Sequence, residues 1–380
     1  MAPVRIALFT PYSPTTGGAG TNYRSLLPHL PGAEIQWFYL SNSTAEYPRS
    51  TNLGPQILGG PILQDAIKSA RLFIQRSHPR IDDCVNAMLK DSPDIVWVDA
   101  INEGLIVGQK LLAAGVKHLH VSVHDDPAGL AIKSSRYRLF APFIDSVARD
   151  LLKRAHTVDT ASEPMQTYYR ERIGVSSGYV YRYIDHPIAS PVELEDKSVV
   201  TIGHVGSAYS APEVFAFLQA LRSISNADGT RFRLINFGTS PAMTAAEKEF
   251  PEIVKNQGNV AEPEVIKRLQ QCAFVYSMYS FNPRHRIFRE TSQPTKISTY
   301  MMAAKPIFVH SPPGSSTMQL LSKYKLGLSE TSLDVPKIAN SIRNILNFQL
   351  DREIVRQAVE HHCGKRNLDY LNECFDLNQL

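Results

Sequence analysis

The most regular feature of the chain is a series of short apolar runs, with longer stretches of helical periodicity between most of them. In the first half these runs cover residues 4–9, 34–40, 94–98, 117–123 and 156–161. Runs of this length that are rich in β-branched and aromatic residues predict strands buried on both faces. Phe140, Ile144, Val147 and Leu151 show the helical spacing that follows them. Strands that alternate with helices predict a parallel sheet covered by helices on both faces.

The same alternation starts again after a stretch without periodicity. Residues 185–196 contain His186-Pro187, Ser190-Pro191 and the acidic Glu193, Glu195 and Asp196, a composition typical of a linker. Beyond it we expect strands at 198–203, 231–237, 258–260, 273–277, 306–310 and 327–329, and helices at 211–224, 262–271, 294–304, 317–323 and 335–346. A last helical stretch, 351–375, has one apolar face. We predict two Rossmann-like, doubly wound α/β domains: residues 1–187, completed by a C-terminal helix at 355–380, and residues 195–350.

Length and composition agree with two ordinary globular domains. The chain has 380 residues, 43% of them hydrophobic and 20% charged, which excludes intrinsic disorder as its main character. The net charge of +4, without any block of consecutive basic residues, disfavours nucleic-acid binding. The four cysteines lack metal-ligand spacing, and the chain shows neither a signal-peptide pattern nor a long apolar run. We therefore expect a cytoplasmic protein whose contact with a membrane, if any, is peripheral.

The loop after the first strand is a candidate ligand site, because doubly wound domains bind ligands at the carboxyl ends of their strands. Gly17, Gly18 and Gly20 occur in this loop, and glycines let backbone N–H groups approach a ligand closely. Their spacing is not that of a dinucleotide fingerprint, which argues against a nicotinamide cofactor. The alternative is a flexible connector.

A second candidate, His124-Asp125-Asp126, follows the predicted strand 117–123 directly. Ionisable side chains at this position suit a general base or the binding of sugar hydroxyls. The alternative is structural: Asp126 caps the turn that Pro127 begins, and His124 hydrogen-bonds within the loop. The chain contains no Asp-x-Asp motif, so the acidic clamp that holds a metal–diphosphate complex is missing, and we predict no metal.

The third candidate is the start of the predicted helix 294–304. Pro294 suits a first helical position and would leave the N–H groups of Thr295, Lys296 and Ile297 available to an anion. Lys296 would add a full positive charge to the same place, so that a diphosphate could bind without a cation. Arg284, Arg286 and Arg289 lie in a loop just upstream and could bind the same phosphates; the alternative is a solvated basic loop.

Other strand ends of the second half could line a nucleotide pocket. These are His204 and Gly206 after the strand 198–203, Val260 at the strand 258–260, and Tyr279 after the strand 273–277. Each of them is alternatively an ordinary strand end.

The order of these pieces resembles the GT-B fold glycosyltransferases and is most similar to glycosyltransferase family four. The resemblance covers nearly the whole chain and rests above all on residues 294–307, PTKISTYMMAAKPI. Looser matches are the loop from Pro11 to Gly17-Gly18, His124-Asp125, Ser162-Glu163-Pro164-Met165, Ile202-Gly203 with Gly206, and Gly258-Asn259-Val260.

The resemblance implies that the C-terminal domain holds a nucleoside diphosphate sugar, that the N-terminal domain holds the acceptor, and that transfer occurs in the cleft between them. It places Gly17 and Gly18 near the diphosphate or the reacting sugar, His124 near the donor sugar, and Lys296 on the diphosphate. Val260 would offer its backbone to the base. Together with the strand-end candidates, the predicted donor site comprises Gly17, Gly18, His204, Gly206, Val260, Tyr279, Arg286, Lys296 and Thr299. The predicted catalytic residues are His124, Asp125 and Asp126.

Two positions depart from the family pattern. Thr299 stands where the family commonly has the second of two glutamates, and His204 stands where an arginine is usual. More of the neutralisation of the diphosphate therefore depends on Lys296 and the nearby arginines. The departures leave open whether the anomeric configuration is retained, as in the family, or inverted. In an inverting reaction Asp125 or Asp126 would be the base.

The sequence therefore predicts a metal-independent glycosyltransferase, without a cofactor beyond its nucleotide-sugar co-substrate, that modifies a glycan or lipid-linked acceptor, as in polysaccharide biosynthesis. The alternatives are a nucleotide-sugar epimerase of the same fold and a catalytically silent nucleotide-sugar-binding subunit. Basic and aromatic residues of the first domain, among them Arg71, Phe73, Lys133, Arg136 and Tyr137, could contact an anionic acceptor or the inner face of a membrane. A solvated helix face would explain them as well.

Overall fold

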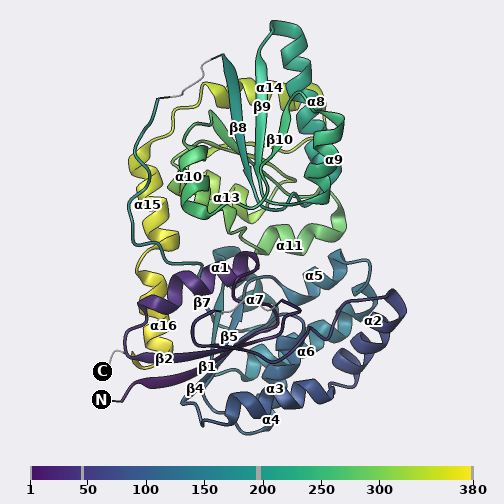
Figure 1. Ribbon diagram of the computed structural model, residues 1–380, viewed down its shortest axis with the longest axis vertical. Coiled ribbons are helices and arrows are strands. Elements are labelled where there is room, and N and C mark those ends of the chain that lie inside the picture. The colour runs from purple at the N-terminus through teal and green to yellow at the C-terminus, as the bar shows by residue number, and fades with distance from the viewer. Residues whose placement is uncertain (1, 44–46, 194–197, 378–380) are drawn as a thin grey trace. The chain divides into compact units, whose positions relative to one another are not determined.

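The computed structural model describes residues 2–43, 47–193 and 198–377, and its chain divides into two compact units (Figure 1). Unit 1 consists of Met1–Ile184, Arg284–Gln293 and His362–Leu380, and unit 2 of Asp185–Pro283 and Pro294–His361. Residues 284–293, which the sequence analysis counted in the second domain, thus belong to the first unit. Leu194, Glu195 and Asp196 of the expected linker lie outside the described residues.

Unit 1 is built on a seven-stranded parallel sheet in the order β3-β2-β1-β4-β5-β6-β7. The strands are β1 (Val4–Thr10), β2 (Ala33–Tyr39), β3 (Ser50–Asn52), β4 (Ile95–Asp99), β5 (Leu119–Val123), β6 (Thr157–Thr160) and β7 (Gly178–Tyr179). The two outermost strands were not expected, because runs of two or three residues are too short to show a pattern. The order reverses between β1 and β4, and this is the point at which such sheets bind ligands.

Helices cover both faces of this sheet. They are α1 (Gly17–Leu26), α2 (Ile62–Ser69), α3 (Pro79–Leu89), α4 (Glu103–Ala113), α5 (Pro127–Lys133), α6 (Ala141–Arg154), α7 (Glu163–Ile173), α11 (Arg286–Thr291) and α16 (Arg366–Cys374), with the short turns η1 (Leu27–His29), η2 (Ala70–Ile74), η3 (Arg138–Phe140) and η4 (Pro283–His285). Local sequence signals determine where these helices begin and end. At α7, for example, the Ser162 hydroxyl accepts the Met165 N–H at 3.0 Å, and Gly174 ends the helix with φ +70°.

Unit 2 contains a six-stranded parallel sheet in the order β10-β9-β8-β11-β12-β13. Its strands are β8 (Val199–Val205), β9 (Arg231–Phe237), β10 (Val254–Asn256), β11 (Phe274–Met278), β12 (Ile307–His310) and β13 (Gly327–Glu330). The expected strand at 258–260 is wrong, because the strand lies at Val254–Asn256. Gly258 has φ +67°, a turn conformation, and makes only an isolated antiparallel bridge with Gly238.

The helices of unit 2 are α8 (Ala211–Asp228), α9 (Pro241–Glu249), α10 (Glu262–Leu269), α12 (Lys296–Met302), α13 (Ser316–Tyr324), α14 (Val335–Leu346) and most of α15 (Arg352–Cys363). Three expectations were wrong in detail. The closing helix 351–375 is two helices, broken at Gly364. The arginine-containing loop upstream of Pro294 is largely helical, as η4 and α11. The helix expected at 294–304 covers only residues 296–302. The predicted class, two doubly wound parallel α/β sheets, is confirmed.

Asn367 fastens the C-terminal helix α16 to the rest of unit 1. This side chain is fully buried, and its amide group donates to the carbonyl oxygens of Arg182 (3.0 Å), His362 (3.0 Å) and Gly364 (3.1 Å). Its carbonyl oxygen accepts the N–H of Tyr181 at 3.1 Å. One side chain thus satisfies four buried backbone groups from two segments that are far apart in the sequence.

We expect the Asn367→Ala variant to lose about 2–3 kcal/mol of stability, because it leaves several buried backbone groups without a partner. Asn344 is an exposed helical asparagine, and the Asn344→Ala variant should change stability by less than about 0.5 kcal/mol. Urea unfolding of both variants measures the difference. Equal stabilities would show that Asn367 does not fasten α16.

Candidate functional site

In unit 2 three of the predicted residues, His204, Gly206 and Lys296, lie together at the carboxyl end of β8, where the strand order reverses between β8 and β11. Lys296, in the first turn of α12, is only 8% exposed. Its Nζ atom donates to the carbonyl oxygen of Ser207 at 2.7 Å and lies 3.4 Å from Nε2 of His204. It also lies 5.0 Å from the ring centre of Tyr209. The ammonium group is therefore held just beneath the loop that follows β8.

The hydrogen bonds around His204 define which ring nitrogen carries its proton. The Asn236 amide nitrogen donates to the carbonyl of Gly238 (3.1 Å) and to the side-chain oxygen of Asn256 (2.7 Å). The Asn236 side-chain oxygen therefore faces Nδ1 of His204, at 2.9 Å, and accepts a proton from it. This leaves Nε2 as an acceptor toward Lys296. His204, which replaces the arginine of the family pattern, orients the ammonium group and adds no charge.

Burial controls the protonation of both side chains. Desolvation lowers the pKa of Lys296 to about 7. Desolvation, followed by the charge of Lys296, lowers the pKa of His204 to about 3, so this ring is neutral at physiological pH. Lys296 is thus close to half-protonated near pH 7, and an anion beside it would restore its charge. Strongly shifted groups of this kind are candidates for functional sites.

Glycines bring the loops after β8, β9 and β10 into backbone contact. Gly206 has φ +73°, and its N–H donates to the Phe237 carbonyl at 2.7 Å. Gly238 donates to the Gly258 carbonyl at 2.7 Å, and a Cβ atom on Gly238 would lie 2.9 Å from the Cα atom of Gly206. No larger residue fits at Gly238 without moving these loops. The contact fixes the start of the segment that leads to Val260, which is half-buried.

A carboxylate that the sequence analysis did not find lies beside Thr299. The Thr299 hydroxyl donates to Oε1 of Glu262, the first residue of α10, at 2.7 Å. Glu262 thus places a carboxylate beside Thr299 from another helix. Its position two residues after Val260 was a local signal, but the pairing with Thr299 depends on the contact between α10 and α12.

Three other expectations for the donor site need correction. The Ile297 N–H donates to the Pro294 carbonyl at 3.0 Å and is not available to an anion. Tyr279 is fully buried and stacks on Tyr209 with ring centres 5.6 Å apart, so it is a core side chain that packs against Tyr209. Arg286 belongs to unit 1, is largely exposed, and pairs with Glu290 at 3.1 Å as a helical surface ion pair.

In unit 1 a second group of side chains lies at the carboxyl ends of β1, β4 and β5. The hydroxyl of Tyr12, in the loop after β1, donates to Oδ2 of Asp99, the last residue of β4. Burial raises the pKa of Asp99 to about 6 and raises that of Tyr12 well above its ordinary value. Neither residue was singled out from the sequence. Asp99 directly follows a buried apolar run, the same signal that identified His124.

His124 has buried ring nitrogens that make no hydrogen bond to any described residue. Its ring stands edge-on to the Tyr23 ring, with ring centres 5.0 Å apart. The structural alternative for this residue, a hydrogen bond within its own loop, is therefore not what the structure has. Buried polar atoms without protein partners are usually satisfied by water or by a ligand. His124 can offer one donor and one acceptor to a sugar hydroxyl.

The two aspartates after His124 differ in their surroundings. Asp126 is 2% exposed; one carboxylate oxygen accepts the Gly129 N–H at 2.6 Å, and the other accepts the Tyr169 hydroxyl at 2.7 Å. Asp126 is the N-cap of α5, so its prediction as a catalytic base is wrong. Asp125 is half-buried, and its charge acts on Tyr12, Asp99 and Lys133. It remains the candidate base of this segment.

Gly17 and Gly18 lie in the first turn of α1, not in a loop as expected. Both are exposed, Gly17 has φ +72°, and a Cβ atom there would meet nothing within 4 Å. The backbone at this helix start is therefore open to solvent. Elsewhere in the described ranges, no three His, Cys, Asp or Glu side chains converge as a metal site would require, and no helix is long and apolar enough to cross a membrane.

No family model matches the chain, and no curated protein matches it in sequence. Solved structures match its fold over nearly the whole length. A sucrose-phosphate synthase from Thermosynechococcus elongatus has a TM-score of 0.67 at 14% identity, over 99% of this chain and 97% of its own. A UDP-forming α,α-trehalose-phosphate synthase from Burkholderia vietnamiensis has a TM-score of 0.64 at 12% identity, over 99% of both chains. MnaA from S. aureus, solved with UDP, has a TM-score of 0.59 at 10% identity, over 100% and 98%. At these identities the likeness shows that the chain has the GT-B fold of these structures.

Proposed function

We propose that the chain is a glycosyltransferase that moves a sugar from a nucleoside diphosphate sugar to a glycan or lipid-linked acceptor. The observation that carries this proposal is the buried Lys296 ammonium group at the strand-order reversal of unit 2, in a GT-B fold. Burial of a cation costs free energy unless an anion or hydrogen bonds compensate it, and a diphosphate is the anion this fold is suited to hold. Proteins of like fold that are named as UDP-forming or solved with UDP support it.

The diphosphate of the donor binds Lys296 and the loop at Ser207, because the preceding Gly206 N–H already donates to the Phe237 carbonyl. Lys296 already donates to the Ser207 carbonyl and faces His204, which leaves one ammonium proton for a phosphate oxygen. A single ammonium group and backbone N–H groups hold the diphosphate without a divalent cation. Metal independence is thus part of the proposal.

The nucleoside binds beside α10. Glu262, held by Thr299, accepts hydrogen bonds from the ribose hydroxyls, and the backbone at Val260 contacts the base. Thr299 therefore has a positioning role. Glu262, from a neighbouring helix, takes the place of the glutamate in the family pattern.

Unit 1 holds the acceptor and the reacting sugar. His124 hydrogen-bonds a hydroxyl of the donor sugar. The exposed backbone at Gly17 and Gly18 contacts the same sugar on the side that carries the diphosphate. We propose retention of configuration: the acceptor oxygen bonds to the anomeric carbon, the bond from that carbon to the phosphate oxygen breaks, and the departing nucleoside diphosphate takes the acceptor proton. In an inverting reaction Asp125 would take that proton instead.

Contact with a membrane stays a prediction. It is supported by exposed apolar side chains in the same region as exposed arginines: Ile62, Leu63 and Ile67 on α2, Ile74 in η2, Leu139 in η3 and Phe143 on α6, with Arg71, Arg76 and Arg138. Apolar and cationic groups together favour an anionic bilayer surface.

We expect the Lys296→Ala variant to lose about 100-fold in kcat/KM for release of nucleoside diphosphate from its sugar donor, because the charge on the departing phosphate is no longer balanced. The assay uses UDP-, GDP-, ADP- and dTDP-sugars with acceptor candidates, in the presence of EDTA. Lys337→Ala, which removes an exposed lysine of unit 2, is the matched control and should keep wild-type activity. NMR of the product gives its anomeric configuration.

The alternative functions would give distinct results in the same assay. Conversion of the donor sugar without any acceptor would identify an epimerase, and donor binding without any turnover would identify a silent binding subunit. Loss of activity in EDTA that Mg²⁺ restores would contradict the metal-independent mechanism.

The role of Glu262 predicts a change in ribose selectivity. We expect Glu262→Gln to weaken UDP binding about 10-fold, because the hydrogen bonds from the ribose hydroxyls lose a charged acceptor, and to leave the affinity for 2′,3′-dideoxy-UDP nearly unchanged. Glu264→Gln, on the exposed face of the same helix, is the control. An equal loss of affinity for the two nucleotides would show that Glu262 does not contact the ribose hydroxyls.

A further inference from the structure

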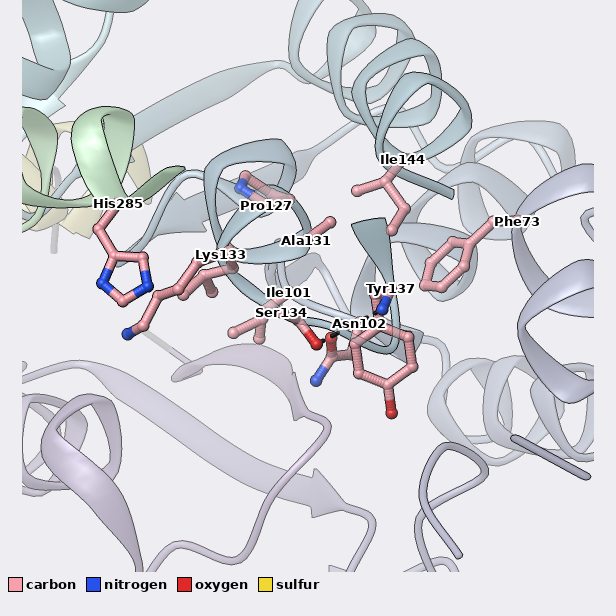
Figure 2. Close-up of a pocket in the computed structure, with 11 residues that line it drawn as sticks. Phe73, Ile101, Asn102, Pro127, Ala131, Lys133, Ser134, Tyr137, Ile144 and His285 are labelled. Atoms are coloured by element: carbon pink, nitrogen blue, oxygen red, sulfur yellow. Dashed lines mark hydrogen bonds between the residues drawn. The ribbon is translucent and has the colours of Figure 1, made fainter. Parts of the chain in front are cut away.

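Unit 1 contains a cavity of about 390 Å³ that the proposed function does not use (Figure 2). Its size is within the usual range for small-molecule pockets. Its lining is mostly apolar and comes from η2, the loop after β4, α5, the segment before η3, α6 and η4. Among the lining residues are Phe73, Ala131, Lys133, Tyr137 and Ile144.

The cavity has an apolar end and a cationic end. In Figure 2, Phe73, Tyr137 and Ile144 stand on one side, and Lys133 and His285 on the opposite side. Phe73 and Ile144 are 2% and 4% exposed. The ammonium group of Lys133 lies 3.7 Å from the ring centre of Phe288. Burial lowers the pKa of Lys133, and an anion beside its ammonium group would oppose that shift, as Asp125 already does.

The apolar end is fixed before any ligand binds. The Tyr137 hydroxyl donates to Oδ2 of Asp65 at 2.9 Å, and the other oxygen of Asp65 accepts the Gly59 N–H at 2.6 Å. Asp65 is 1% exposed, so this anchor is buried. Because the Tyr137 ring is held by its own hydroxyl, the wall does not depend on a ligand for its shape, and less ordering is required on binding.

The cavity adjoins the candidate catalytic segment. Pro127 and Leu130, which line it, follow Asp125 by two and five residues, and the charge of Asp125 acts on Lys133 as well as on Tyr12 and Asp99. Asn102, also in the lining, has the rare backbone angles φ 48° and ψ −120° and lies three residues after Asp99. Sparsely populated backbone angles in a non-glycine residue concentrate at functional sites.

We propose that this cavity binds the apolar part of an amphiphilic anion, with an alkyl or aryl group toward Phe73 and Tyr137 and an anionic group at Lys133. The inference rests on the proposed function, for which it selects a lipid-linked acceptor over a plain glycan. Apolar surface at one end and a cation at the other match such a molecule, whereas a glycan would place hydroxyl groups against carbon without hydrogen bonds.

Calorimetry with octyl phosphate below its micelle concentration tests the proposal, with 1-octanol and inorganic phosphate as partial ligands. We expect octyl phosphate to bind at least 10-fold more tightly than either. Ala131→Phe, which fills the cavity, should weaken the binding of octyl phosphate at least 10-fold, and Ala131→Met should weaken it by less. Lys133→Gln should remove most of the preference over 1-octanol. Ala113→Phe and Lys153→Gln are exposed matched controls in unit 1 and should bind as wild type does.

UDP affinity, measured on the same proteins, separates this proposal from the function on which it rests. It should be unchanged in every one of these variants, which also verifies that they fold. Octyl phosphate binding that survives Ala131→Phe and Ala131→Met, or that is lost instead in the surface variant Leu63→Ser, would overturn the cavity as the site. If UDP does not bind but the octyl phosphate results are as expected, the glycosyltransferase proposal is contradicted and the cavity is supported as a binding site.

Discussion

The candidate site of unit 2 depends on a positive charge that the fold buries away from water. Lys296 is 8% exposed, and its ammonium group has a backbone carbonyl and a neutral histidine as neighbours. These contacts compensate only part of the lost hydration, which is why burial lowers its pKa to about 7. A group in this condition gains more from an anion than an exposed lysine does. The strand order of unit 2 places that group where doubly wound sheets bind ligands.

The remainder of the candidate site keeps this charge in position. Glycine contacts between the loops after β8 and β9 hold the carbonyl that Lys296 binds, and the Asn236 side chain sets the tautomer of His204. In unit 1 the candidate residues also lie at the carboxyl ends of strands. There Tyr12 hydrogen-bonds to Asp99, and the buried ring nitrogens of His124 have no partner among the described residues. Each unit thus offers hydrogen-bonding groups of the kind that its proposed ligand needs, a phosphate in one and sugar hydroxyls in the other.

The sequence predicted most of the fold, because runs buried on both faces and amphipathic helices are local patterns. It missed β3 and β7, which are too short for a pattern, and misplaced β10, because Gly258 belongs to a turn. Candidate residues were found where the signal was local, as for His124 and Lys296. Glu262 was missed because its meaning depends on Thr299, 37 positions away. Asp126 was misassigned, since only the structure shows that Gly129 and Tyr169 occupy both of its oxygens.

Calorimetric titration of the protein with UDP between pH 7 and pH 9 tests the central claim most directly. Bound diphosphate should raise the pKa of Lys296 above about 7, so the complex binds more protons than the unliganded protein, and affinity falls as the pH rises through the pKa of the unliganded group. We predict at least a 10-fold loss of affinity over this range, with proton uptake that is visible in buffers of different ionisation enthalpy, and neither effect in Lys296→Met. A wild-type affinity that is constant over the range, or a slope that Lys296→Met shares, would contradict the account.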